Sequence, residues 1–441
     1  MSTHTDRDMP GREEIVAATS RPMPRWVTTV SAAFAIIGLV TFVVGALAGQ
    51  DRVWQALHFN WLFFVSVSQA GVVFVAVQRI TTARWSRPVV RMLEGYVAFL
   101  PIGFVLLLLI LLGRSHIFPW LHTPAPAPEK RAYLAMPFLA TREILIYGLL
   151  LWLSLWYIYT SVRLDVGLLP EAGAKWAAGI RARMRRGFRD ERREIHSTHS
   201  LQGKLAVILC ILFNFGFIVM SWDFSMSLDP FFQSTMYGWW FYMGGWVAAL
   251  MSWSLLVMWW RRHLAADEYI TEHHFHDLGK LGFAFTAFWG YLTFAQYLVI
   301  WYGNLAEETH WFHLRLIQPW MGITLSIVFL SFVIPFFGLL SRAAKVYLPT
   351  FFLFALCSVL GIWLLRFIEV YPSLHYDSAH VPFGLPEIGV TLGFLGLWGL
   401  SYRAFMDAFP RMRVTLMTSP YRDEVQVPVN PDTMEPLPAH E

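Results

Sequence analysis

Residues 276–309 read HDLGKLGFAFTAFWGYLTFAQYLVIWYGNLAEET, and this stretch decides the fold class. Its middle is apolar enough for a helix that crosses a bilayer, which takes roughly 20 residues. It nevertheless carries Lys280, Thr293 and Gln296, and polar groups at membrane depth normally face protein or water inside a bundle. At 100° per residue the polar side chains fall on two faces of the helix. We therefore expect a membrane-spanning helix that is surrounded by other helices.

The composition of the whole chain agrees with this class. Hydrophobic residues make up 56% of the 441 positions, and the mean hydropathy is +0.47. Charged residues make up 15%, whereas a soluble globular chain has roughly 25%. The two cysteines, Cys210 and Cys357, lie far apart inside apolar runs. We expect them to be small buried side chains and part of neither a disulfide framework nor a metal motif.

Ten apolar runs are each close to the roughly 20 residues that a transmembrane helix needs. We therefore predict an all-α polytopic membrane protein, with a ten-span membrane domain at residues 26–408. Residues 1–25 and 409–441 are predicted to be cytoplasmic tails, and residues 162–200 a basic cytoplasmic loop. The predicted spans are 26–48, 58–78, 93–113, 138–161, 201–221, 237–260, 278–301, 317–341, 347–371 and 384–405.

The basic residues predict how the chain is oriented. Lys and Arg concentrate in alternate loops, and such loops mark the cytoplasmic side of a membrane protein. Both termini and the loop with RARMRRGFRDERREIH at 181–196 are therefore expected in the cytoplasm. We attribute the charge of this loop to topology and contact with anionic lipid, or alternatively to a cytoplasmic partner, and not to nucleic acid. Of the 34 Lys and Arg residues, the other side receives Arg52, Arg114, Lys130, Arg131, Arg142, Arg315 and Arg366.

A first group of titratable residues lies where the quoted stretch enters the membrane. His276 and Lys280 are four residues apart and share a helical face, and Asp277 is adjacent. Histidine titrates near neutral pH, and burial lowers the pKa of a lysine, so that it exchanges protons. We interpret His276, Asp277 and Lys280 as the inner mouth of a proton path. Ordinary solvated histidines, and a zinc site formed with His273 and His274, remain as alternatives.

The middle of this path is predicted along the same helix. Thr293 and Gln296 would orient water molecules within the membrane. Lys280 and Gln296 are separated by about 24 Å at 1.5 Å per residue and lie on different faces. Water or a group from a neighbouring span, for which Tyr237 is the candidate, is therefore expected to bridge them.

Carboxylates at the other ends of the spans form the predicted outer mouth. Asp223 and Asp229 bracket the short loop SWDFSMSLD, and Glu308 follows the quoted stretch. We expect these three carboxylates to end the path, although the two aspartates would alternatively cap the next helix. Arg366 and Glu369 are one helical turn apart, which predicts an ion pair within one helix.

The sequence has no motif for a redox cofactor. A haem in a membrane bundle needs axial ligands, commonly histidine, at membrane depth. The 15 histidines fall in predicted tails, loops or span ends, as His58 does. There is also no Cys-x-x-Cys-His, iron–sulfur cysteine set or convincing nucleotide-binding glycine loop. We expect no cofactor or metal in this chain and no catalysis by the isolated chain, with a quinone headgroup bonded to Gln296 or His276 as the alternative.

Several segments resemble the membrane subunits of alternative complex III, a bacterial quinol:cytochrome c oxidoreductase. The resemblance is closest to the F subunit, the smaller of two polysulfide-reductase-like subunits, and spans roughly residues 54–410. Its most specific string is WYGN-x-x-EET, within which Ala306 stands where the family often has proline. The segments are SWDFSMSLDPFFQSTMYG at 221–238, HDLGKL at 276–281, QYLVIWYGNLAEET at 296–309, ARWSRPVVRMLEG at 83–95 and residues 130–142.

The resemblance implies two four-helix bundles plus two peripheral helices in a bacterial inner membrane. It also implies as partners a larger homologous membrane subunit, an iron–sulfur subunit, and multihaem and monohaem cytochromes c, which would carry the iron–sulfur clusters and haem c. In the family, quinol oxidation is placed in the sister subunit, and proton conduction has been suggested for subunits of this kind. We expect a cofactor-free subunit that anchors redox partners and conducts protons or contributes to quinol binding. The alternatives are a stand-alone ion transporter, for which we find neither interrupted spans nor inverted repeats, and a structural scaffold.

Overall fold

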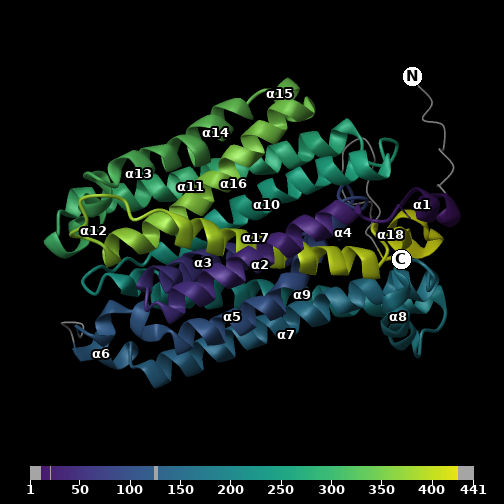
Figure 1. Ribbon diagram of the computed structural model, residues 1–441. Helices are drawn as coiled ribbons and strands as arrows, with labels where there is room; N and C mark the ends of the chain where they lie inside the picture. Colours follow the sequence, from purple (N-terminus) through teal and green to yellow (C-terminus); the bar gives the residue numbers. More distant parts are fainter. Residues whose placement is uncertain (1–10, 20, 124–127, 426–441) are drawn as a thin grey trace.

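The computed structural model describes residues 11–19, 21–123 and 128–425 as a long bundle of helices (Figure 1). No strand occurs among these residues, so the all-α prediction is confirmed. Nine helices of the described part are long and apolar enough to cross a membrane. They are α2 (Arg25–Leu47), α3 (Asp51–Ile80), α4–η1–α5 (Val90–Leu112), α7 (Met136–Leu168), α9 (Glu191–Phe224), α10 (Tyr237–Leu264), α11 (Glu272–Gly303), α13–η6–α14 (Met321–Gly338) and α16 (Leu348–Leu374).

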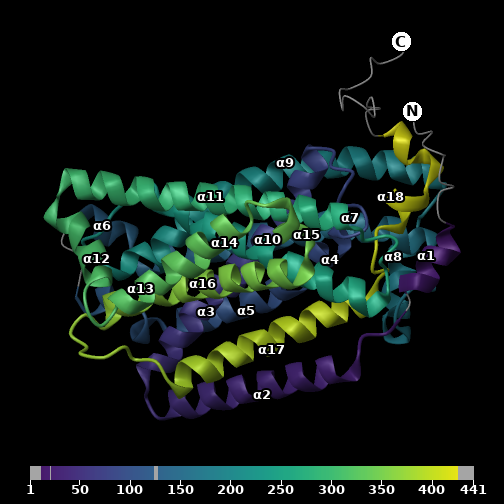
Figure 2. The same ribbon diagram turned by 90° about the horizontal axis from the view of Figure 1, so that it is seen from above.

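The tenth predicted span is also a helix, α17 (Leu385–Ala408). Its 24 residues are enough to cross a membrane, although it is not among the nine apolar helices named above. It packs along the full length of α2, and Figure 2 shows the two helices side by side at one edge of the bundle. The α2–α17 pair is therefore a peripheral layer made from the first and last long helices.

The remaining eight spans form the two four-helix bundles that were predicted. In the first, α9 packs against α3 and α7, and α5 packs against α3 and α7. In the second, α10 packs against α11 and α16, and α16 packs against α13 and η6. The two bundles meet where α3 contacts α10 and α16. The α2–α17 pair covers α3 and η1 of the first bundle.

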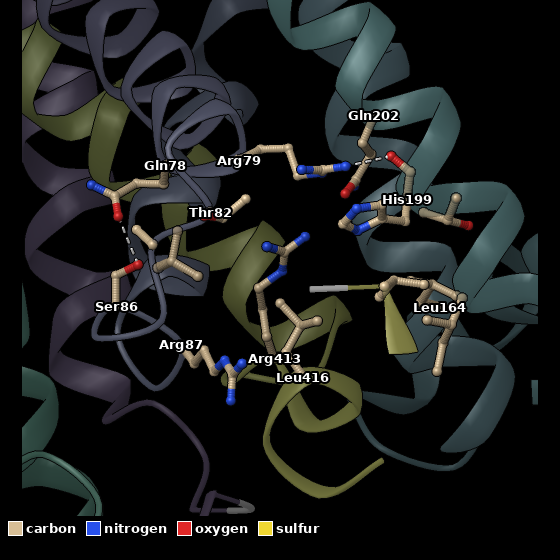
Figure 3. A pocket seen from close by; sticks show the side chains of 15 residues that line it. Gln78, Arg79, Thr82, Ser86, Arg87, Leu164, His199, Gln202, Arg413 and Leu416 are labelled. Atoms are coloured by element: carbon tan, nitrogen blue, oxygen red, sulfur yellow. Dashed lines mark hydrogen bonds between the residues drawn. The ribbon is translucent and has the colours of Figure 1, made fainter. Parts of the chain in front are cut away.

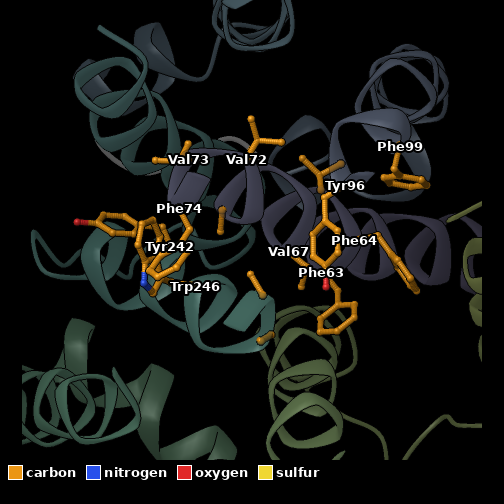
Figure 4. Packing of buried hydrophobic residues seen from close by; sticks show 14 of the residues in the cluster. Phe63, Phe64, Val67, Val72, Val73, Phe74, Tyr96, Phe99, Tyr242 and Trp246 are labelled. Carbon is orange, nitrogen blue, oxygen red and sulfur yellow. The ribbon is translucent and has the colours of Figure 1, made fainter. Parts of the chain in front are cut away.

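The element at the centre of the molecule is α3, and not α11. Of the most apolar 18-residue window of α3, 94% is buried, against 28% for α11. Figure 4 shows Phe63, Phe64 and Phe74 of α3 packed against side chains of neighbouring helices. The prediction that α11 is surrounded by helices is therefore wrong. Its Tyr291 is 62% and its Phe294 61% exposed, because only one face of α11 packs on the bundle.

Two of the spans depart from α-helical geometry. A 3-10 segment, η1 (Gly95–Phe99), joins α4 to α5, and a π-helical segment, η6 (Phe329–Val333), joins α13 to α14. Ser331 of η6 is buried and comes so close to α16 that a Cβ built on Gly361 would lie 2.2 Å from its Oγ. Interrupted spans were not expected from the sequence, although Pro101 follows η1 and Pro335 follows η6, and a proline removes a backbone hydrogen bond of a helix. This expectation is corrected.

Short helices gather at the two ends of the bundle (Figures 1 and 2). We call the end that holds residues 181–196 the basic end and the other the opposite end. Residues 12–19, predicted to lie in a tail, form α1, where Arg12 pairs with Glu191, and the second tail is helical as far as residue 424. Residues 1–10 and 426–441 lie outside the described residues. The short elements are α1 (Arg12–Thr19), η4 (Lys175–Ala177), α8 (Ala178–Arg185), α15 (Arg342–Val346), α18 (Val414–Thr418) and η7 (Pro420–Glu424) at the basic end, and η2 (Arg114–His116), η3 (Pro119–Leu121), α6 (Pro128–Tyr133), η5 (Met226–Leu228) and α12 (Ala306–Leu316) at the opposite end.

Candidate functional site

A fully buried ion pair lies on α16, near the opposite end of the bundle. Arg366 Nη1 is 2.6 Å from Glu369 Oε1 and 2.7 Å from Glu369 Oε2, and both side chains are 0% exposed. The predicted pair within one helix is confirmed. Burying charges costs roughly several kcal/mol per ion, and the attraction between the two charges offsets this cost. Ionisable residues at membrane depth are accordingly rare and usually functional.

This pair is connected to two other helices by hydrogen bonds. Ser225, at the end of α9, donates to Glu369 Oε2 at 3.3 Å, and its hydroxyl lies 2.6 Å from the Tyr237 hydroxyl at the start of α10. Arg366 Nη2 donates to the carbonyl of Phe241 at 2.6 Å, and the guanidinium lies 3.6 Å from the centre of the Phe241 ring. The four side chains Arg366, Glu369, Ser225 and Tyr237 form what we call the α16 network.

A second arginine covers the α16 network at the membrane surface. Arg315 of α12 is 3% exposed and donates to the backbone carbonyls of Ile368 and Glu369, each at 3.0 Å. Burial lowers the pKa of Arg315 to about 10. Because the Arg315 side chain caps the carbonyl groups of α16, it fixes the helix that carries the buried ion pair.

On its inner side the α16 network reaches α11. A Cβ built on Gly244 of α10 would lie 3.4 Å from both Arg366 Nη2 and Trp289 Nε1, so glycine permits these two side chains to approach. Within the described chain, Arg366 Nε, Trp289 Nε1 and Thr286 Oγ1 are buried and have no hydrogen-bond partner. Buried polar atoms of this kind normally bond to ordered water. The face of α11 that carries Thr286 and Trp289 is therefore polar and turned toward the ion pair.

A buried acid pair lies in the first bundle at the same end. Asp223, predicted to lie in a loop without basic residues, is in the last turn of α9 and is paired with Arg142 of α7 at 2.7 Å. Glu143 is 0% exposed, and no described group donates a hydrogen bond to either of its carboxylate oxygens or to Asp223 Oδ1. The Arg142 guanidinium also lies 4.0 Å from the ring centre of Tyr133, whose pKa is raised by burial. The cluster thus holds two carboxylates and a single arginine.

Asp229 does not cap α10, whose first residue is preceded by Met236. Its Oδ1 accepts from the backbone N–H of Phe231 at 3.1 Å, which closes a turn, and its Oδ2 lies 3.5 Å from His310 Nδ1. Lys130 holds the same loop by donating to the carbonyl of Phe232 at 3.0 Å. Burial lowers the pKa of Lys130, although the nearby carboxylates of Asp229 and Glu307 raise it. Asp229 therefore stabilises the loop at the mouth.

The structure brings Gln296 and Glu308 together in one pocket. This pocket has a volume of about 550 Å³ and lies between the end of α9, the 233–236 loop, α11 and α12. Gln296 is 3% exposed, and its Oε1 has no partner within the described residues. Trp222 Nε1 of α9 lines the same pocket and is likewise buried without a partner. The pocket is therefore apolar overall, with one acceptor and one donor left unsatisfied.

The predicted inner mouth is not connected to these groups. Lys280 is 55% exposed and forms an ion pair with Asp277 at 2.7 Å, so the idea that Lys280 is drawn into the bundle is wrong. Tyr237 lies beside Glu369 and does not bridge Lys280 and Gln296. Thr293 accepts from Trp240 Nε1 and donates to a backbone carbonyl, each at 2.9 Å, which satisfies its hydroxyl.

The histidines beside the inner mouth have other roles. His274 Nδ1 lies 3.1 Å from both the backbone nitrogen and the hydroxyl of Thr271, and thereby closes a capping box at the start of α11. His276 lies two residues further along the helix and is half-buried. No group of three His, Cys, Asp or Glu side chains that could hold a metal ion occurs among the residues described.

His58 corrects the prediction that the histidines lie in tails, loops or span ends. It lies two turns inside α3, is 0% exposed, and packs between the rings of Phe118 and Phe224, each 6.0 Å away. Its ring nitrogens make no hydrogen bond of normal geometry within the described part. The apolar run that marks this span starts later than the helix, which begins at Asp51, and so hid its position.

Sequence reasoning also missed a buried ionic cluster at the basic end. Arg91 and Glu94 of α4 are 0% exposed and paired one turn apart, as Arg366 and Glu369 are on α16. Arg91 also pairs with Asp165 of α7. The cluster continues to Ser161, Arg413 and Thr415. The only available signal was the repeated pattern Arg-x-x-Glu inside an apolar run, RMLE at 91–94 and RFIE at 366–369.

Comparison with known proteins gives no assignment. No family model matches this sequence. No curated protein matches it either.

Proposed function

We propose that this chain is a membrane subunit of a bacterial respiratory quinol:cytochrome c oxidoreductase and that it conducts protons within that complex. The observation that carries the proposal is the α16 network, in which a fully buried Arg366–Glu369 pair is bonded to Ser225 and, through Ser225, to Tyr237. A carboxylate kept at membrane depth is costly, and such residues commonly belong to proton relays. The resemblance of residues 221–238 and 296–309 to alternative complex III supplies the physiological setting.

The proposed proton path does not run along α11, where the sequence predicted it. It begins at the basic end with Arg91, Glu94 and Asp165, and it ends at the opposite end with the α16 network. Between them lies α3, whose buried polar side chains occur along its whole length. These side chains include Gln55, His58, Asn60, Ser66, Ser68, Gln69 and Gln78. Water bonded to buried polar atoms would complete the connection.

The redox chemistry is placed on partners. Haem c and iron–sulfur clusters would belong to cytochrome c and iron–sulfur subunits, and quinol oxidation to a larger homologous membrane subunit. The pocket around Gln296 and Glu308 is the site in this chain where a quinol headgroup would find hydrogen-bonding groups. We place the chain in the inner membrane with both termini in the cytoplasm.

Purification from native membranes tests the assembly. We expect the full-length chain to be isolated together with haem-bearing and iron–sulfur polypeptides, and the purified single chain to lack a Soret band. A Soret band that stays with the single chain would contradict the assignment of haem to partners. Isolation of the native protein as a lone polypeptide would contradict membership of a complex.

Substitution of Glu369 tests proton conduction. In the assembled complex in proteoliposomes, Glu369→Gln removes the titratable group while preserving its shape. We expect assembly and quinol turnover to persist while proton release per electron falls. The matched control is Glu387→Gln, because Glu387 is equally buried and also bonded to an arginine, Arg52 at 2.7 Å, but lies outside the path. Equal coupling in the two variants would make Glu369 structural and leave a scaffold as the function.

A stand-alone ion transporter is the second candidate, and one observation favours it. The π-helical segment at 329–333 interrupts a span, and interrupted helices are common where transporters bind their substrates. This alternative requires ion flux through vesicles that contain only this chain. The main proposal requires that coupled proton movement appear only with the complete complex and a quinol substrate.

A further inference from the structure

A small polar cavity at the basic end lies between the end of α3 and the beginning of α9. Its volume is about 50 Å³, enough for a few water molecules or one phosphate group. Figure 3 shows Arg79, Arg413 and His199 pointing toward one another across this cavity, with Gln202 beside them. We call it the Arg79 cavity. It adjoins the beginning of the path described above, because Arg413 pairs with Glu94 and Gln78 of α3 lines the cavity.

Among the described residues, the carboxylates beside the Arg79 cavity are already shared between arginines. Arg413 Nε lies 3.3 Å from Glu94 Oε1, and Arg91 is paired with both Glu94 and Asp165. These two carboxylates therefore serve two arginines. Arg79 is left without a carboxylate partner among the described residues.

The Arg79 side chain is held in place rather than free to leave. Its Nη2 donates to the carbonyl of His199 at 2.8 Å. Gly203 allows this approach, because a Cβ there would lie 3.4 Å from the same nitrogen. The Nε–H of Arg79 is buried and has no partner in the described structure. A fixed guanidinium with an unsatisfied donor is suited to bind an anionic oxygen.

The depth of the cavity matches the surface of a bilayer. Helix α9 has 34 residues and is about 51 Å long at 1.5 Å per residue, which exceeds the roughly 30 Å hydrocarbon core. His199 lies near its start at the basic end. Val207 and Ile208, which are exposed apolar residues, follow about 12 Å further along the same helix. A phosphate bound at the cavity would therefore lie where lipid headgroups meet acyl chains.

We propose that the Arg79 cavity binds a phosphate group, supplied by an anionic phospholipid or by free phosphate. Arg79 and Arg413 provide the charge, and the unsatisfied N–H of Arg79 provides a directed hydrogen bond. Basic pockets between transmembrane helices bind phospholipid headgroups in this way. The site requires no substrate of the proposed complex and does not depend on proton conduction.

The test uses the purified full-length chain in neutral lipid nanodiscs, with phosphatidylglycerol and inorganic phosphate as separate probes. We expect Arg79→Gln to weaken binding about tenfold or more, as the loss of one charge-assisted hydrogen bond predicts. Arg183→Gln is the matched control, because Arg183 is exposed on α8 at the same end and lies outside the cavity. Equal affinities in the two variants would overturn the proposal.

A second pair of variants avoids changes to buried arginines. Thr82 lines the cavity, is exposed, and has a φ of 50°, a conformation that aspartate and asparagine adopt more readily than most residues. Thr82→Asp places a competing carboxylate at the rim and should weaken binding about tenfold, whereas Thr82→Asn should leave it near the wild-type value.

The two probes identify the source of the phosphate. Retention of phosphatidylglycerol alone assigns a lipid headgroup, and binding of inorganic phosphate alone assigns a free ion. If neither probe binds until residues 426–441 are deleted, the cavity binds carboxylates of the chain itself, and the proposal is wrong.

Discussion

Gly38 of α2 and Gly393 of α17 lie in direct backbone contact, and a Cβ built on Gly38 would be 2.1 Å from the Cα of Gly393. The contact continues along α17, where Gly389 lies against Thr41 and Gly396 against the backbone of Ala35. Small residues four apart let two membrane helices approach closely, and packing then takes the place of a hydrophobic driving force. The α2–α17 pair is held by this close approach.

The first prediction concerns that contact. Gly38→Leu should separate α2 from α17 and destabilise the chain by at least about 1–3 kcal/mol, the usual cost of overpacking. Thermal unfolding in detergent measures the change. Gly322→Leu is the control, since a Cβ built on Gly322 meets no atom within 4 Å. Equal melting temperatures for the two variants would show that the helices do not depend on this contact.

The second prediction concerns the energetics of the buried ion pair. Arg366→Met leaves Glu369 as an uncompensated buried charge and should cost about 3–5 kcal/mol. The double variant Arg366→Met, Glu369→Leu removes both charges and should recover most of that loss. Denaturation of the four members of this cycle measures the coupling. A double variant that is as unstable as the sum of the single variants would mean that the two side chains act independently.

The third prediction concerns orientation. In a chain whose Cys210 and Cys357 are replaced by serine, a cysteine at the exposed position 183 should resist an impermeant thiol reagent in intact cells. A cysteine at Phe231, which is 54% exposed at the opposite end, should react. The reverse pattern would place the basic end outside the cell, against the distribution of Lys and Arg.

The fourth prediction concerns pH. Burial and the nearby Arg52 lower the pKa of His375, whose Nε2 lies 2.7 Å from Gln55 Oε1. Because the folded state disfavours the protonated ring, His375 contributes stability that is present above its unfolded pKa of about 6.5 and is lost as the pH falls through its lower folded pKa. Between about pH 7 and about pH 5, the wild-type protein should therefore lose more stability than the His375→Gln variant. Parallel stability curves from thermal unfolding would contradict this.

The sequence predicted the helices and the polar face of α11, but not which helix is central. Thr286, Trp289 and Gln296 do share the buried face of α11. What failed was the inference that polar groups on a second face also meet protein. Lipid tails are as apolar as leucine, so an apolar run has the same sequence pattern whether lipid or protein covers it. The central position of α3 follows from contacts between distant segments, which periodicity does not encode.

The sequence predicted only the outer half of the candidate site. Tyr237 and Asp223 do lie in buried networks, but the charged residues of those networks, Glu369 and Arg142, are 132 and 81 positions away, respectively (369 − 237 and 223 − 142). Charge pairing at such separation depends on how helices pack. The exposed Lys280 was misplaced because a lysine near a span end is compatible with a buried and with a surface position.

The pairing of α2 with α17 also sets an order of events during synthesis. The two helices are separated by 338 residues, counted from Leu47 to Leu385 (385 − 47), which a ribosome adds in about 17–68 s at ~5–20 residues per second. During that interval the face of α2 around Gly38 lacks the α17 helix against which it packs in the finished chain. An 18-residue window of α2 has a mean hydropathy of 2.4, against 1.7 for α3. Helix α2 is therefore better suited to remain in lipid without a partner helix. Completion of the chain, and not its beginning, closes this edge of the molecule.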